Sequence, residues 1–133
     1  MRVMSIDLGI GSRLPAYCTS MGRVLLAGLP DAELKAHVAR VKLVRLTGRT
    51  VATPEELMSV LKTVRRDGYS VVDQELEIGL RSIAVPVLDR DGRPVAAINI
   101  GTQSSRVSVA EMESRFLPPL RAAAHELGLL LAR

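Results

Sequence analysis

The residues best suited to chemistry in this 133-residue sequence are a single cysteine and two histidines. Cys18 stands just before an apolar segment that should be helical, and a helix N-terminus lowers the pKa of a thiol. A cysteine nucleophile also needs a base, but His37 and His125 lie far away in the sequence and outside any polar motif. We therefore expect Cys18 to be a packed or pocket-lining residue. A cysteine-nucleophile enzyme is the alternative hypothesis.

Metal and nucleotide chemistry have weaker support. One cysteine and two distant histidines do not have the spacing of metal ligands. The three carboxylates of the segment DQELE, which are Asp73, Glu75 and Glu77, either face a ligand or form a solvated rim. We expect Glu77 on the rim and leave the role of Asp73 open. Gly9 and Gly11 lack the third glycine of a dinucleotide-binding fingerprint. We expect no metal and no cofactor.

Composition narrows the class of protein. The net charge is only +4, and aromatic residues make up 2% of the chain, so a stacking platform for single-stranded nucleic acid is not expected. No apolar run approaches the ~20 residues that span a bilayer, and the N-terminus lacks the apolar core of a signal peptide. A lone cysteine cannot form an internal disulfide. These features favour a cytoplasmic protein with no membrane partner.

The periodicity of apolar residues predicts both strands and helices. Strands are expected at 3–10 and 69–73, and a hairpin over 81–101 should turn at Asp91-Gly92. Helices are expected over 19–27, 32–40, 53–67 and 108–131, and residues 42–51 should form a loop or short strand. This order predicts an α+β fold in which helices cover an antiparallel sheet. The chain opens directly on a strand and shows few others, so we expect the later part of a domain whose first elements are absent.

Several residues should define element boundaries. Thr53 and Ser108 each begin a capping box, with Glu56 and Glu111 three residues later. The pair Pro118-Pro119 predicts a kink or two separate helices in the last segment. Pro86 has no N–H to donate, so it belongs at a sheet edge or a bulge.

Three stretches place small polar residues beside apolar ones: 17–21, 79–82 and 99–102. Small-molecule pockets are commonly built this way, with apolar walls and a few placed hydrogen-bonding groups.

The same stretches carry a family resemblance. LPAYCTSMGRVLLAGLP, RRDGYSVVDQELEIGLRSIAVPVLDRDGRPVAAINIGTQSSR and FLPPLRAAAHELG resemble, in this order, the effector-binding domain of IclR-type transcriptional regulators. The resemblance extends from about Ser12 to the C-terminus. Within that family, YCTSMGR and the segments around DQELE and GTQ are most similar to regulators of aromatic-acid catabolism, which serve the protocatechuate, 4-hydroxybenzoate, muconate or β-ketoadipate pathways.

The resemblance implies a GAF-like domain over residues 1–133 that senses a small acid. It implies that the first strands and an upstream winged helix-turn-helix domain are missing, that operator DNA is bound only through that domain, and that the protein is a homodimer or tetramer. The effector would be an aromatic or dicarboxylic acid, and the domain would not be an enzyme. A ligand-free oligomerisation domain is a further alternative.

The resemblance also implies an effector site. Backbone N–H groups of Ser20 and Met21 would meet an effector carboxylate. Val72 stands where relatives often have an acid, and Gly101 leaves space for a ring. The full set of implied effector-binding residues is Leu14, Tyr17, Ser20, Met21, Val72, Asp73, Leu80, Ser82, Asn99 and Gly101, with Arg13 as a further candidate.

Overall fold

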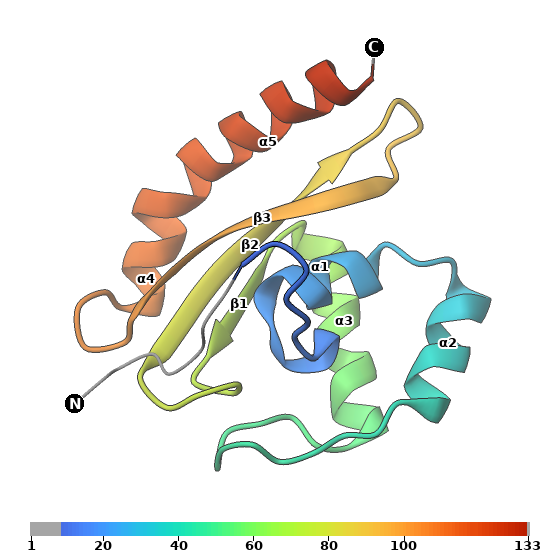
Figure 1. Cartoon of the computed structure of the whole chain (residues 1–133), viewed down its shortest axis with the longest axis vertical. Helices are drawn as coiled ribbons and strands as arrows, with labels where there is room; N and C mark the ends of the chain where they lie inside the picture. Colours follow the sequence, from blue (N-terminus) through green and yellow to red (C-terminus); the bar gives the residue numbers. More distant parts are fainter. Residues whose placement is uncertain (1–8, 133) are drawn as a thin grey trace.

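The computed structural model describes residues 9–132 (Figure 1). Its elements, in chain order, are η1 (Ala16–Cys18), α1 (Ser20–Ala27), α2 (Asp31–Arg40), α3 (Pro54–Asp67), β1 (Ser70–Asp73), β2 (Leu80–Leu88), β3 (Pro94–Gln103), α4 (Val109–Glu111), η2 (Met112–Phe116) and α5 (Leu117–Leu131). The three described strands form one antiparallel sheet in the order β1-β2-β3. The predicted α+β fold is therefore confirmed, while the strand expected at 3–10 falls almost wholly outside the described residues.

The sheet separates two layers of helices. On one face, Ile83, Val85 and Val87 of β2 pack with Met112, Leu120 and their neighbours in η2 and α5. On the opposite face lies α1, and Figure 1 shows α5 running along the first face while α1 and α3 lie across the second. Because successive side chains of a strand point to opposite faces, every second residue of β2 is left to face α1.

A second apolar cluster joins the helices to one another. Its buried members, from η1, α1, α2 and α3, are Tyr17, Cys18, Leu26, Leu34, Val38, Leu57 and Leu61. The cluster explains the amphipathic pattern of α3, whose apolar stripe faces α1 and α2 rather than the sheet. It also holds η1 and the start of α1 in place above the sheet.

The helix boundaries follow the predicted capping residues. The hydroxyl of Thr53 accepts a hydrogen bond from the backbone N–H of Glu56 at 3.2 Å, and Gly68 ends α3 in the left-handed conformation with a φ of 75°. Ser108 and Glu111 form the expected capping box. Residues 42–51 contain no strand, in agreement with the loop alternative.

The prolines interrupt regular structure near the positions that the sequence predicts. Pro118 and Pro119 lie at the start of α5, directly after the π-helical turn η2, so the last helical segment is divided as expected. Pairing of β1 with β2 ends at Ser70 and Ala84, which leaves the β1 side of Pro86 without a strand neighbour among residues 9–132. A register shift follows between Val87 and Leu88. Pro86 thus lies on the middle strand of the described sheet, at a point where β1 no longer pairs with it. The predicted edge position applies only to this short stretch of β2.

The hairpin turns where expected, at Asp91-Gly92. Gly92 has a φ of 77°, and Asp89 accepts hydrogen bonds from the backbone N–H groups of Asp91 and Arg93.

No helix in the described part of the chain is both long and apolar enough to cross a membrane.

We predict that Gly22→Ala destabilises the domain. A Cβ at Gly22 would overlap the backbone of Ala16 in η1, and overpacking of this kind costs about 1–3 kcal/mol. Urea unfolding measures the loss. Gly48→Ala is the matched control, because nothing lies within 4 Å of a Cβ there, and its unfolding midpoint should stay near that of the parent chain.

Candidate functional site

A cavity of about 390 Å³ lies between the start of α1 and the face of the sheet that turns toward it. Its lining consists of Leu14, Cys18, Thr19, Ser20, Met21, Val72, Leu76, Leu80, Ser82, Asn99 and Gly101. The volume falls within the ~300–1,000 Å³ of typical small-molecule sites. The lining is mainly apolar and holds no lysine, arginine or histidine among the described residues.

The pleat of the sheet brings the strand residues together. Val72 of β1 pairs with Ser82 of β2, and Ser82 pairs with Gly101 of β3. Leu80 lies two residues before Ser82 on β2, and Asn99 lies two residues before Gly101 on β3. Side chains two residues apart on a strand point to the same face, so Leu80 and Asn99 share the face of Ser82 and Gly101. Asn99 and Gly101 are exposed, so the cavity opens on the β3 side.

The start of α1 supplies the polar end of the cavity. Thr19 caps the helix, its hydroxyl accepting from the N–H of Gly22 at 3.2 Å. The first N–H groups of a helix have no partner within the helix, and here they belong to the lining residues Ser20 and Met21. The side chain of Ser20 is buried, and its Oγ accepts a hydrogen bond from the Oγ of Ser82 at 2.8 Å, which joins the start of α1 to β2. These groups can meet an anion with N–H and O–H donors and with the positive end of the helix dipole.

Tyr17 and Asp73 do not line the cavity. The Tyr17 hydroxyl donates to the carbonyl of Val44 at 2.7 Å and accepts from its N–H at 3.0 Å, so it holds a loop. Asp73 follows Val72 on β1 and points to the opposite face. There it accepts a hydrogen bond from Arg81 Nε at 2.9 Å and pairs with Arg49 at 3.1 Å. Burial raises the pKa of Asp73, but the hydrogen bond and charge of Arg81 outweigh it and the pKa is lowered.

The remaining candidates are placed by the same geometry. Arg13 is exposed and is not part of the lining. Leu14, Ser20, Met21, Val72, Leu80, Ser82, Asn99 and Gly101 all line the cavity. Whether they bind an effector is taken up below.

The structure adds Cys18, Thr19 and Leu76 to the lining. The sequence predicts that Cys18 is either packed or lines a pocket, and in the structure its side chain has no exposed surface. Burial, partly offset by the charge of Arg23, raises the pKa of Cys18 to about 11. At neutral pH the thiol is therefore protonated, which removes the electrostatic basis for a cysteine nucleophile. Leu76 lies in the connector after β1, where the sequence carries no periodic signal.

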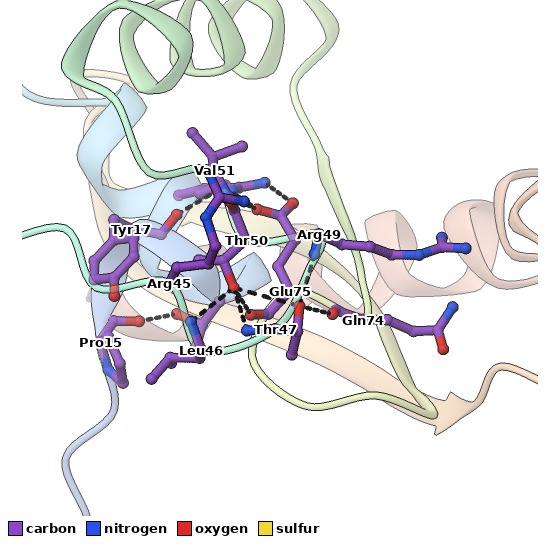
Figure 2. A network of polar contacts seen from close by, with 12 residues as sticks. Pro15, Tyr17, Arg45, Leu46, Thr47, Arg49, Thr50, Val51, Gln74 and Glu75 are labelled. Carbon is purple, nitrogen blue, oxygen red and sulfur yellow. Dashed lines mark hydrogen bonds and ion pairs between the residues drawn. The ribbon is translucent and has the colours of Figure 1, made fainter.

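A buried ion pair that the sequence analysis missed supports the start of α1, and its carboxylate, Glu75, is labelled in Figure 2. Arg23 donates to both carboxylate oxygens of Glu75, at 2.8 and 2.6 Å, and its Nε donates to the carbonyl of Tyr17 at 2.8 Å. The Arg23 side chain is 2% exposed and that of Glu75 is 12% exposed. The sequence signal was a lone arginine inside the apolar segment MGRVLLA, which a buried acid must neutralise.

The same carboxylate anchors the loop between α2 and α3, as Figure 2 shows. Glu75 Oε1 accepts from the N–H of Val51 at 2.9 Å, and the carbonyl of Glu75 accepts from the Thr50 hydroxyl at 2.6 Å. Thr47 donates to the carbonyl of Gln74 at 2.7 Å. The connector that carries Leu76 is thus tied to α1 on one side and to this loop on the other.

Comparison with known proteins assigns the family. A model of the C-terminal domain of the bacterial transcriptional regulator IclR matches residues 1–129. The Pca regulon regulatory protein of Pseudomonas putida is 52% identical over 126 residues, which are 95% of this chain and 43% of that protein. The p-hydroxybenzoate hydroxylase transcriptional activator of Acinetobacter baylyi is 38% identical over 132 residues, which are 98% of this chain and 48% of that protein.

Solved structures agree. A crystal structure described as a transcriptional regulator from Rhodococcus sp. RHA1 superposes with a TM-score of 0.93 at 49% identity, covering 98% of this chain and 52% of that one. The inducer-binding domain of the PobR transcription factor from Acinetobacter, solved as a double mutant with 3-hydroxybenzoic acid, gives a TM-score of 0.85 at 35% identity. That match covers 93% of this chain and 73% of the PobR chain.

The chain belongs to the IclR family and has the fold of its C-terminal domain. It spans about half the length of the curated relatives, which are named as transcriptional regulators rather than enzymes.

We predict that Glu75→Gln destabilises the domain by about 3–5 kcal/mol, because it leaves the buried Arg23 guanidinium without a counter-charge. Urea unfolding measures the change. Asp31→Asn removes an exposed ion pair with Arg65 and serves as the control, which should unfold near the parent midpoint. Equal midpoints for all three chains would contradict the role assigned to the buried pair.

We also predict that Cys18 is unreactive in the folded chain. Raising the thiol pKa from 9.0 to about 11 lowers the thiolate fraction at pH 8 on the order of 100-fold. Iodoacetamide labelling at pH 8, followed by intact mass, should be slower by at least this factor in buffer than in urea. Equal labelling rates in buffer and in urea would contradict this prediction and support the nucleophile hypothesis.

Proposed function

We propose that this chain is the effector-binding domain of a transcriptional regulator and that its cavity binds a small organic acid, aromatic or dicarboxylic. The observation that carries the proposal is the meeting of a capped helix N-terminus with an apolar cavity at Ser20 and Met21. A carboxylate there accepts from helix N–H groups without a cationic side chain. The named functions of the relatives, in the Pca regulon and in p-hydroxybenzoate metabolism, support the chemical class.

The rest of the ligand lies against the sheet. Val72, Leu76 and Leu80 supply apolar contact, and Gly101 contributes no side-chain volume beside them. Asn99, at the open side, offers an amide to a hydroxyl or to a second carboxylate. The PobR inducer-binding domain was solved with 3-hydroxybenzoic acid, a ligand with an apolar ring and two polar ends.

The wider function follows from the family. The regulator would bind operator DNA through a winged helix-turn-helix domain outside residues 1–133, act in the cytoplasm and assemble as a dimer or tetramer. Effector binding would favour one arrangement of the assembly and so change its affinity for the operator. Neither a cysteine enzyme nor a ligand-free domain is supported by a specific observation.

Thermal melting against a panel of acids tests the proposal. The panel contains protocatechuate, 4-hydroxybenzoate, muconate and β-ketoadipate, with 4-hydroxybenzamide as the uncharged counterpart of one member. A ligand at 100 times its Kd adds about 2.7 kcal/mol, which raises Tm by several degrees at this chain length. We expect at least one acid to raise Tm and 4-hydroxybenzamide not to.

A cavity-filling variant locates the effect. Gly101→Leu places a side chain in the cavity, whereas Thr102→Leu places the same side chain on the opposite face of β3. The shift should be lost in the first variant and kept in the second. No shift with any acid in the parent chain, or an equal shift in both variants, would contradict the proposal.

A further inference from the structure

Two residues, Cys18 and Leu76, belong both to the lining of the cavity and to the apolar cluster that joins the helices. No other lining residue among residues 9–132 packs in that cluster. The wall between the cavity and the cluster therefore consists of these two side chains. Cys18 is completely buried in η1, whereas Leu76 is half-buried and comes from the connector between β1 and β2. Because the leucine side chain is the larger one, Leu76 decides how far this wall reaches into the cavity.

The connector that carries Leu76 is closed at its base by hydrogen bonds. The N–H of Gln74 donates to the carbonyl of Leu80 at 2.8 Å, and the side-chain oxygen of Gln74 accepts from the N–H of Gly79 at 3.0 Å. Gln74 itself has a φ of 61°, a left-handed conformation that few residues other than glycine adopt. Such a conformation persists only where the surrounding contacts hold it, so the backbone path from 74 to 79 is tightly defined.

The residue before Leu76 is held from two sides. The carboxylate of Glu75 accepts from the buried guanidinium of Arg23, which belongs to α1. Figure 2 shows Glu75 against the loop between α2 and α3, where its carboxylate accepts from the N–H of Val51 and its carbonyl from the Thr50 hydroxyl. The backbone at Leu76 therefore has a fixed position relative to the start of α1, where the carboxylate of a ligand is proposed to bind.

The other apolar lining residues are less suited to limit the size of a ligand. Val72 and Leu80 extend from strands of the sheet, and Met21 has a flexible thioether that adapts to what it contacts. Behind Leu76 lies the helical cluster, so a shorter side chain at position 76 would extend the cavity into apolar surroundings. Apolar cavities of this kind stay dry and take up apolar groups.

We propose that Leu76 is a specificity-determining residue of the effector site and that it limits the bulk of the apolar part of the ligand. The inference rests on the proposed function, because it concerns the same cavity. It narrows the ligand class to acids whose apolar part is a single ring or an unbranched chain. A hydrophobic wall separates ligands that differ by one methylene group by about 10-fold to 200-fold in affinity, and larger groups should be separated at least as well.

Isothermal titration calorimetry with two pairs of acids tests the proposal. The pairs are 4-hydroxybenzoate with 6-hydroxy-2-naphthoate and adipate with 3-tert-butyladipate, because each pair keeps the polar groups and adds apolar bulk. In Leu76→Ala, the affinity for the bulky acid relative to the small acid should rise at least tenfold. In Leu76→Phe, the same ratio should fall. The ratio is used because a loss of folded protein lowers both affinities by the same factor.

Leu43→Ala is the matched control. Leu43 is half-buried and packs against the same helical cluster, but it does not line the cavity, so this variant should keep the parent ratio. Thermal melting confirms that each variant is folded. An unchanged ratio in both Leu76 variants, or an equal change in Leu43→Ala, would overturn the inference and leave the effector site standing. If none of the acids tested here and in the melting panel binds the parent chain or any variant, the proposed function fails and this inference fails with it.

Discussion

The buried pair between Arg23 and Glu75 is the constraint on which the cavity depends. A guanidinium with 2% of its surface exposed is tolerated only where a carboxylate and further hydrogen bonds satisfy it. Both oxygens of Glu75 and the carbonyl of Tyr17 do this, and these bonds join the connector after β1 and the turn η1 to α1. The position of the helix start relative to the sheet is therefore set by a geometry that permits little variation.

The alternation of strand side chains distributes the remaining roles. On β1 and β2, adjacent residues face opposite sides of the sheet. Val72 and Ser82 face the cavity, while Asp73 and Arg81 pair on the other face. A shift of one residue in register would bring the ion pair into the cavity and the cavity residues beneath α5. The Tyr17 hydroxyl holds η1 to the 42–51 loop, and Thr47 and Thr50 of that loop hold the connector that carries Leu76. These parts of the lining are therefore fixed by polar contacts outside the cavity.

Much of this architecture could be predicted from the sequence because the signals were local. The capping residues Thr53 and Ser108, the turn at Asp91-Gly92 and the break at Pro118-Pro119 all act within a few residues. The sequence could not show which face each residue of YSVVD would take, so Val72 and Asp73 were both candidates. It also could not show that Arg23 meets Glu75, because that contact joins residues 52 positions apart. The family resemblance identified most of the lining, whereas Leu76 lies in a connector without periodicity.

The central claim is that a small acid binds between the start of α1 and the sheet, and its most direct test is an amide chemical-shift titration of this chain with 4-hydroxybenzoate and β-ketoadipate. The account predicts saturable shifts for one or both acids, largest at the amides of Ser20, Met21, Ser82 and Gly101. Shifts confined to α5 and the opposite face of the sheet, or none at saturating acid, would contradict it.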